Sequence, residues 1–152
     1  MRMADTLFLD FEGEGPKGPG RIPQLPFLAG LYRPKARGRK SQFSVSLFRE
    51  NCTPVKNGIG EISEITTLEA FIERITEQAE TEGLTICYWS DHELAIIKRF
   101  LKPKRRLIKR FEAISLNILP QARKHLRRIG QEPPDSGNKV LNHYLAIICP
   151  KA

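Results

Sequence analysis

The feature that most constrains the fold of this sequence is a short apolar run, Leu84-Thr-Ile-Cys-Tyr-Trp89, between two segments with helical periodicity. A run of this length without alternation is typical of a strand that is buried on both faces of a sheet. Such a strand needs helices on its faces, and the neighbouring segments can supply them. This helix–strand–helix pattern predicts an α/β fold.

Two capping boxes mark the starts of the flanking helices. Thr66-Thr-Leu-Glu69 and Ser90-Asp-His-Glu93 each place a hydroxyl residue three positions before a glutamate, so that each side chain bonds the other residue's backbone N–H. The first helix is expected to end at Gly83 and the second before Pro103. The first helix has one apolar stripe, formed by Leu68, Phe71, Ile72, Ile75 and Ala79.

Three strands are predicted before these helices, over residues 6–12, 27–33 and 42–49. The basic stretch 33–40 is expected to form the loop of an antiparallel hairpin. After the second helix, helical spacing resumes in residues 107–114, residues 115–119 fit a short strand end, a helix starts at Pro120, and residues 139–148 fit a helix or a strand. The order predicts an α/β mixed sheet of three antiparallel strands followed by parallel strands, with helices packed on it, in a single domain over residues 1–152.

Length and composition limit the class of protein further. The chain has 152 residues, 40% of them hydrophobic, which suits one globular domain. No apolar run approaches the ~20 residues of a membrane span, and an acid as early as Asp5 argues against a signal peptide. Cys52, Cys87 and Cys149 form neither a CxxC pair nor a zinc spacing. We therefore expect reduced thiols in a cytoplasmic protein, and neither a membrane protein, a secreted disulfide scaffold nor a zinc finger.

Charge is distributed unevenly along the chain, whose formal net charge is +8. Residues 50–93 hold 2 basic and 10 acidic side chains, whereas residues 94–130 hold 12 basic and 1 acidic. The basic segment includes Arg105, Arg106, Lys109 and Arg110. Such density favours a nucleic acid as partner, since each neutralised phosphate releases counterions. A solvated basic helix face and a nonspecific interaction patch stay open as alternatives.

Asp10 and Glu12 stand out because charged residues are costly inside so apolar a strand. Strand side chains alternate, so these two carboxylates share one face, with Cα atoms about 6.6 Å apart. Oxygen ligands placed in this way suit one or two Mg²⁺ or Mn²⁺ ions. An edge strand with a wet face, or acids at the mouth of a turn, would explain the same residues without a metal.

Asp91 follows the buried strand at the start of the next helix. Ligands of α/β sheets gather at the carboxyl ends of strands, so Asp91 would face Asp10 and Glu12 if the two strands are parallel neighbours. An acid at this position also stabilises a helix N-terminus electrostatically. Glu93 is explained by capping.

The loop over residues 13–20 is rich in glycine and proline. Its match to GxGxxG is not followed by a helix, so it does not predict a dinucleotide-binding turn. Lys17 and Arg21 flank the two carboxylates of the first strand and are candidates for contacts with a phosphate backbone. A simple linker is the alternative.

Two segments of the chain resemble the ribonuclease H-like superfamily, in particular its DEDD-type 3′–5′ exonucleases. Leu7-Phe-Leu-Asp-Phe-Glu12 is similar to the first motif of these enzymes. Ile86-Cys-Tyr-Trp-Ser-Asp-His-Glu-Leu-Ala-Ile-Ile-Lys-Arg-Phe100 is similar to the predicted RecB-family nuclease-like branch, in which a Tyr-rich strand end leads into a helix. The order of elements predicted above agrees with a ribonuclease H-like fold.

The resemblance implies two Mg²⁺ or Mn²⁺ ions bound by four acids, one activating a water and the other stabilising the leaving oxygen of a phosphodiester. It assigns Asp10, Glu12 and Asp91 as metal ligands and catalytic residues. Asn117 stands where a similar segment usually has an aspartate, and no acid follows Gly137, so the family's C-terminal aspartate has no counterpart here. A truncated chain, a ligand from elsewhere and a degenerate binder are open explanations.

Three hypotheses about function follow. The first is a metal-dependent nuclease that acts on DNA or RNA through Asp10 and Glu12, with 3′–5′ exonuclease activity as the candidate reaction. The second is a basic nucleic-acid-binding protein of the same fold without catalysis. The third is a protein-interaction module in which the acidic segment of one molecule meets the basic segment of another.

Overall fold

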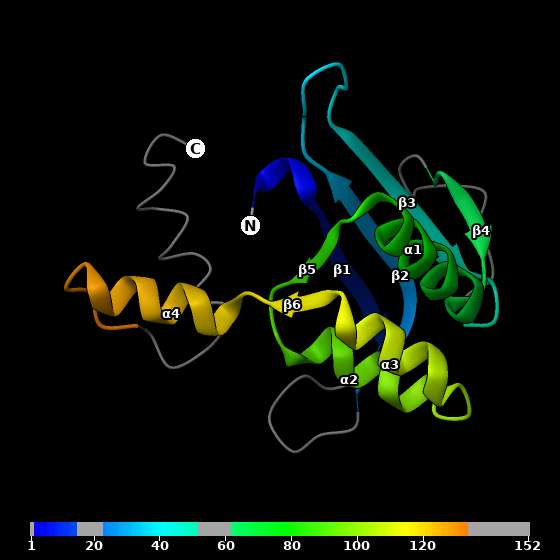
Figure 1. The fold of residues 1–152 in the computed structure, drawn as a ribbon. Coiled ribbons are helices and arrows are strands. Elements are labelled where there is room, and N and C mark those ends of the chain that lie inside the picture. The colour runs from blue at the N-terminus through cyan, green and yellow to red at the C-terminus, as the bar shows by residue number, and fades with distance from the viewer. Residues whose placement is uncertain (1, 15–22, 52–61, 134–152) are drawn as a thin grey trace.

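The computed structural model describes residues 2–14, 23–51 and 62–133 and has an α/β architecture (Figure 1). The strands are β1 (Thr6–Glu14), β2 (Leu25–Arg33), β3 (Gln42–Phe48), β4 (Glu64–Thr66), β5 (Thr85–Tyr88) and β6 (Ser115–Asn117). The helices are a 3-10 turn, η1 (Met3–Asp5), and α1 (Leu68–Glu82), α2 (Asp91–Phe100), α3 (Arg105–Ala113) and α4 (Leu119–Arg128). The predicted segment 139–148 lies outside the described residues.

All six strands form one mixed sheet in the order β4-β3-β2-β1-β5-β6. β1, β2 and β3 pair antiparallel, and β5 and β6 continue the sheet parallel to β1. The predicted mixed α/β sheet is thereby confirmed. β4, which pairs parallel with β3, was not predicted, because a strand of three residues carries almost no alternation.

The helix boundaries follow the capping residues, with one correction. α1 starts one residue later than the predicted capping box, because Thr67 rather than Thr66 is the N-cap and accepts from the Ala70 N–H at 3.1 Å. The glutamate that reaches this terminus is Glu50, which accepts from the Leu68 N–H at 2.7 Å, so Glu69 does not complete a capping box here. At the other end Gly83 adopts φ 68°, as predicted for a helix-ending glycine.

Helices α1, α2 and α3 cover one face of the sheet and form the core with it (Figure 1). Alternation along β1 directs Leu7, Leu9 and Phe11 into this core, where Phe11, Phe48 and Phe71 pack with edge-to-face rings. The apolar stripe predicted for the first helix is buried in full. The core therefore fixes which side chains of β1 point to the other face.

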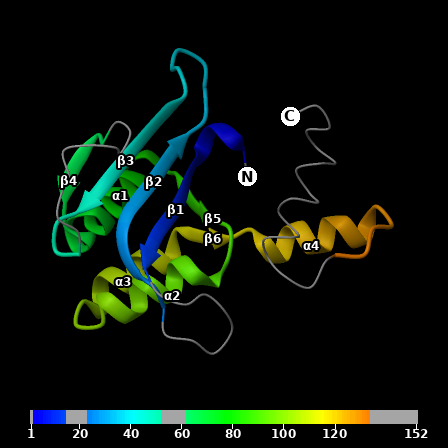
Figure 2. The same cartoon turned by 180° about the vertical axis from the view of Figure 1, so that it is seen from behind.

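Seen from behind, β1 and β2 lie in front of the three helices and no described helix covers them (Figure 2). α4 extends away from the rest of the fold beyond β6. In the part of the chain that the structure describes, Ala122 and Leu126 of α4 form a small apolar cluster separate from the main core, against which Trp89 and Leu119 pack. Among the described residues, no helix is both long and apolar enough to cross a membrane.

Candidate functional site

Asp10 and Glu12 lie on the helix-free face of β1. The buried residues of this strand alternate with them, and both acids are exposed, as the predicted shared face requires. Asp10 stands opposite Gly30 in the β1–β2 register, so no side chain of β2 lies directly beside it. The carboxylate of Asp10 is thus accessible from the open side of the sheet.

On the side away from β2, the neighbour of β1 is β5, and the two strands are parallel. This is the arrangement that the predicted site shared by the two strands requires. Their pairing ends at Phe8 and Cys87. Because β5 stops at Tyr88 while β1 continues to Glu14, the second half of β1 pairs with β2 on one side and has no paired strand on the β5 side among the described residues. α2 begins just beyond the end of β5 and contacts β1.

Glu93, in the first turn of α2, is the acid whose pKa responds to the charge of Asp10. Its side chain is only 4% exposed, which is unusual for a glutamate. Burial is the main cause that raises the pKa of the Glu93 carboxyl to about 7, and the negative charge of Asp10 contributes to this rise. The backbone N–H groups of Glu93 and Ser90 donate to the carboxylate and oppose this shift. Asp10 on β1 is exposed and Glu93 on α2 is buried, and the charge of the first still acts on the carboxyl of the second.

The capping box at this junction is confirmed. Ser90 is the N-cap of α2; its hydroxyl oxygen accepts from the His92 N–H and its O–H donates to the Glu93 Oε2, both at 3.4 Å. Glu93 accepts in return from the Ser90 N–H. Capping alone was the sequence interpretation of Glu93, and it missed the burial of this carboxyl. A capping glutamate that directly follows a buried parallel strand is the signal that identifies such a residue.

Asp91 lies on the other side of the junction. It is exposed and accepts from the Asn117 Nδ2 at 2.8 Å. Asn117 belongs to β6, which is separated from β1 by β5. The same asparagine accepts from the Leu119 N–H at 3.1 Å, so Asp91 and Asn117 tie the start of α2 to the start of α4. Asp10 and Glu12 on the one hand and Asp91 on the other thus contact different partners.

The carboxylates fit a hard cation in chemistry, since oxygen donors at a like-charged pair are what Mg²⁺ and Mn²⁺ require. Burial of Glu93 under the influence of the Asp10 charge is the structural observation behind this fit, because a cation would offset both the desolvation and the repulsion. Within the described residues, no three acidic, histidine or cysteine side chains converge as a preformed metal group. The candidate donors for such an ion are Asp10, Glu93 and, one pleat further along β1, Glu12.

The basic residues predicted for nucleic-acid contacts divide into different groups. Arg105, Arg106 and Lys109 are exposed on α3, on the helix-covered side of the sheet. Arg110 donates to Glu80 on α1 through its Nε at 3.0 Å and its Nη2 at 2.6 Å. This ion pair lowers the pKa of Glu80. Lys17 and Arg21 lie outside the described residues.

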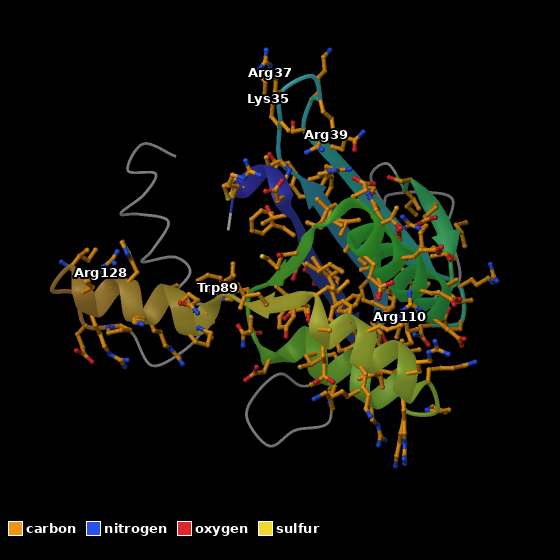
Figure 3. All side chains as sticks on the ribbon, in the orientation of Figure 1. Lys35, Arg37, Arg39, Trp89, Arg110 and Arg128 are labelled. Atoms are coloured by element: carbon orange, nitrogen blue, oxygen red, sulfur yellow. The ribbon has the colours of Figure 1, made fainter. Side chains whose placement is uncertain are left out.

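Other cations lie at the far ends of the molecule (Figure 3). Lys35, Arg37 and Arg39 project from the loop between β2 and β3, Arg110 lies on α3, and Arg128 lies on α4. α4 and the loop are thus separate basic surfaces.

Comparisons of the chain with protein-family models, with curated proteins and with solved structures found no match.

Proposed function

We propose that this chain is a ribonuclease H-like nuclease domain that cleaves phosphodiester bonds of DNA or RNA with a divalent cation, Mg²⁺ or Mn²⁺. The observation that carries the proposal is the burial of Glu93 at the start of α2, just after the carboxyl end of β5, where the charge of Asp10 on β1 acts on its carboxyl. A buried, ionised glutamate destabilises a fold unless it takes up a proton or a positive charge compensates it. Perturbed acids of this kind cluster at functional sites.

The topology supports the same proposal. Three antiparallel strands, then a helix, a parallel strand on the other side of β1, a helical segment and a further parallel strand are the order that the sequence resemblance implies. In this order β1 is central and its neighbour β5 ends where α2 begins. Asp10 therefore lies at the position where α/β sheets bind their ligands. The short edge strand β4 is an addition outside this frame.

When bound, the cation would activate a water and stabilise the leaving oxygen of the phosphodiester. Asp10, Glu93 and Glu12 would hold it. Ser90 positions the Glu93 carboxylate through the capping box. Asp91, predicted as a third ligand, acts in this proposal as a structural link to Asn117.

Cleavage of labelled single- and double-stranded oligonucleotides with Mg²⁺, with Mn²⁺ and with a chelator tests the proposal. We expect metal-dependent products that Asp10→Ala removes and that Glu77→Ala, an exposed acid of α1, leaves unchanged. We expect Asp91→Asn to keep most of the activity. Absence of cleavage by a folded, monodisperse sample with either metal would reject catalysis.

Binding of nucleic acid without catalysis is the second candidate. The absence of a three-residue metal group among the described residues favours it, because catalysis by two metals needs more ligands than Asp10 and Glu93 supply. Thermal unfolding with Mn²⁺ separates the two candidates. An increase in melting temperature that Asp10→Asn abolishes supports a metal site. Nucleic-acid binding without any metal effect supports the second candidate.

A further inference from the structure

The helix-free face of the sheet carries a row of aromatic side chains next to the carboxylates. The strand register places Phe8 opposite Tyr32 and Tyr32 opposite Phe43 on three adjacent strands. The rings of Phe8 and Tyr32 are 6.3 Å apart. Phe43 is 68% exposed and Tyr32 is 39% exposed, which is high for aromatic residues in a sheet. Aromatic faces that no described helix covers are available to a partner.

The next row on this face contains Asp10, paired with Gly30, which pairs with Val45. Rows two residues apart along a strand are about 6.6 Å apart. Gly30 of β2 has no side chain, so none rises there between the aromatic row and Asp10. The atoms nearest to the position that a Cβ would take at Gly30 belong to the Phe43 ring. The aromatic row thus adjoins the candidate metal site directly.

The loop between β2 and β3 adds positive charge at the other end of the aromatic row. Its segment 33–42 contains five basic residues and no acid. Two of the five have structural partners: Arg33 pairs with Glu82 at 2.5 Å, and Arg39 donates to the Pro34 carbonyl at 2.9 Å. The other three are exposed and form no ion pair within the described residues: Lys35, Arg37 and Lys40.

We propose that this hairpin platform, defined as Phe8, Tyr32, Phe43, Lys35, Arg37 and Lys40, binds single-stranded nucleic acid. The choice of a nucleic acid as occupant rests on the function proposed above. Exposed rings stack on bases, and the loop cations contact phosphates. A duplex keeps its bases stacked on each other and offers none to Phe43, so the platform selects single strands. A strand held in this way would run from the loop toward Asp10.

Fluorescence anisotropy with a labelled oligo-dT of about 15 nucleotides and a duplex of the same length tests the proposal. Chelator is present throughout, so binding is measured without metal-dependent cleavage. We expect the single strand to bind more tightly than the duplex. Phe43→Ala should weaken binding of the single strand about tenfold, since loss of one stacking partner has an effect of this size. Ile129→Ala, which removes another exposed apolar side chain, is the matched control and should have no effect.

The charge contribution is tested by Lys35→Ala/Arg37→Ala against Arg105→Ala/Arg106→Ala. Each variant loses two exposed positive charges, but only the first changes the platform. We expect the first to reduce the slope of log affinity against log salt by about 1.4, the value for two phosphate contacts on a single strand. Equal effects of the two double variants would show that only net charge matters and would overturn the proposal.

Unchanged affinity of Phe43→Ala for the single strand would also overturn the proposal. If the mass from light scattering decreased in that variant at the same time, the aromatic row would be a protein interface. Phe43→Tyr, which keeps a ring, should retain binding and shows that a loss in Phe43→Ala is due to stacking. Because cleavage is not measured, a failure of the nuclease proposal and a failure of this one are distinguishable.

Discussion

The Asp10–Glu93 pair links the folding of this protein to pH. In an unfolded chain Glu93 titrates near its ordinary pKa of 4.5, whereas burial raises the pKa to about 7 in the fold. The folded state therefore binds more protons between these two values. The contribution of Glu93 to stability is complete below pH 4.5 and is lost as the pH rises through about 7.

Replacement of the charge tests this linkage. A rise in pKa from 4.5 to about 7 corresponds to about 3 kcal/mol of unfolding free energy. Glu93→Gln keeps an oxygen that accepts from Ser90 but has no charge to desolvate. We expect it to be more stable than the wild type at about pH 8 and nearly equal at about pH 5. Thermal unfolding at both pH values gives the comparison, and an equal difference at both would contradict it.

At this scale the sequence predicts Asp10 and Glu12 well, because alternation along a strand is a local property. Exposure of both side chains on one face of β1 follows from Leu9 and Phe11 entering the core. The burial of Glu93 could not be predicted in the same way. It depends on how far β1 continues past the end of β5, and no residue near Glu93 specifies that offset.

Among the elements, α4 is attached differently from the other helices. α1, α2 and α3 share the main core, whereas Ala122 and Leu126 of α4 form, among the described residues, a cluster of their own with Trp89 and Leu119. Asn117 adds a hydrogen bond at the first turn of α4. A cluster separate from the main core predicts that α4 opens independently of the sheet.

Leu126→Ala tests this independence. Leu126 is fully buried, and such a truncation costs about 2–5 kcal/mol where the site does not collapse. We expect hydrogen exchange of α4 amides to become fast while the amides of β1 and β2 keep their protection. Ile75→Ala, in the main core, should instead accelerate exchange in the whole sheet. Equal loss of protection in both regions by Leu126→Ala would refute independent opening.

Most elements could be predicted because their signals are local. The capping residue Ser90, Gly83 and the apolar stripe of α1 define helix ends and faces without reference to the rest of the chain. The start of α1 was displaced by one residue because Glu50, distant in sequence, bonds its first turn. β4 was missed for a similar reason, since it forms only by pairing with β3.

In the whole molecule, the acidic and basic segments meet each other internally. Lys104 pairs with Glu69 at 3.0 Å, and Arg110 pairs with Glu80 at 2.6 Å, so α1 and α3 partly neutralise each other. The same attraction was the basis for expecting contacts between two copies of the chain. Pairs formed within one molecule leave less charge for that association.

We therefore expect a monomer. Light scattering at about 50 mM and about 500 mM salt should give the mass of one chain, 17.3 kDa, in both conditions. Arg110→Glu would place like charges beside Glu80 and expose acidic surface of α1. Association of the wild type at low salt that disappears at high salt would contradict this prediction and would support the interaction-module hypothesis.

The buried carboxylate of Glu93 lowers the stability of the fold, whereas the function proposed above depends on it. Glutamine at this position would cap α2 equally well without a charge, so the present residue makes the chain weaker at neutral pH than its fold requires. A laboratory selection for heat resistance alone should therefore replace Glu93 early. A selection for the chemistry proposed here should retain it.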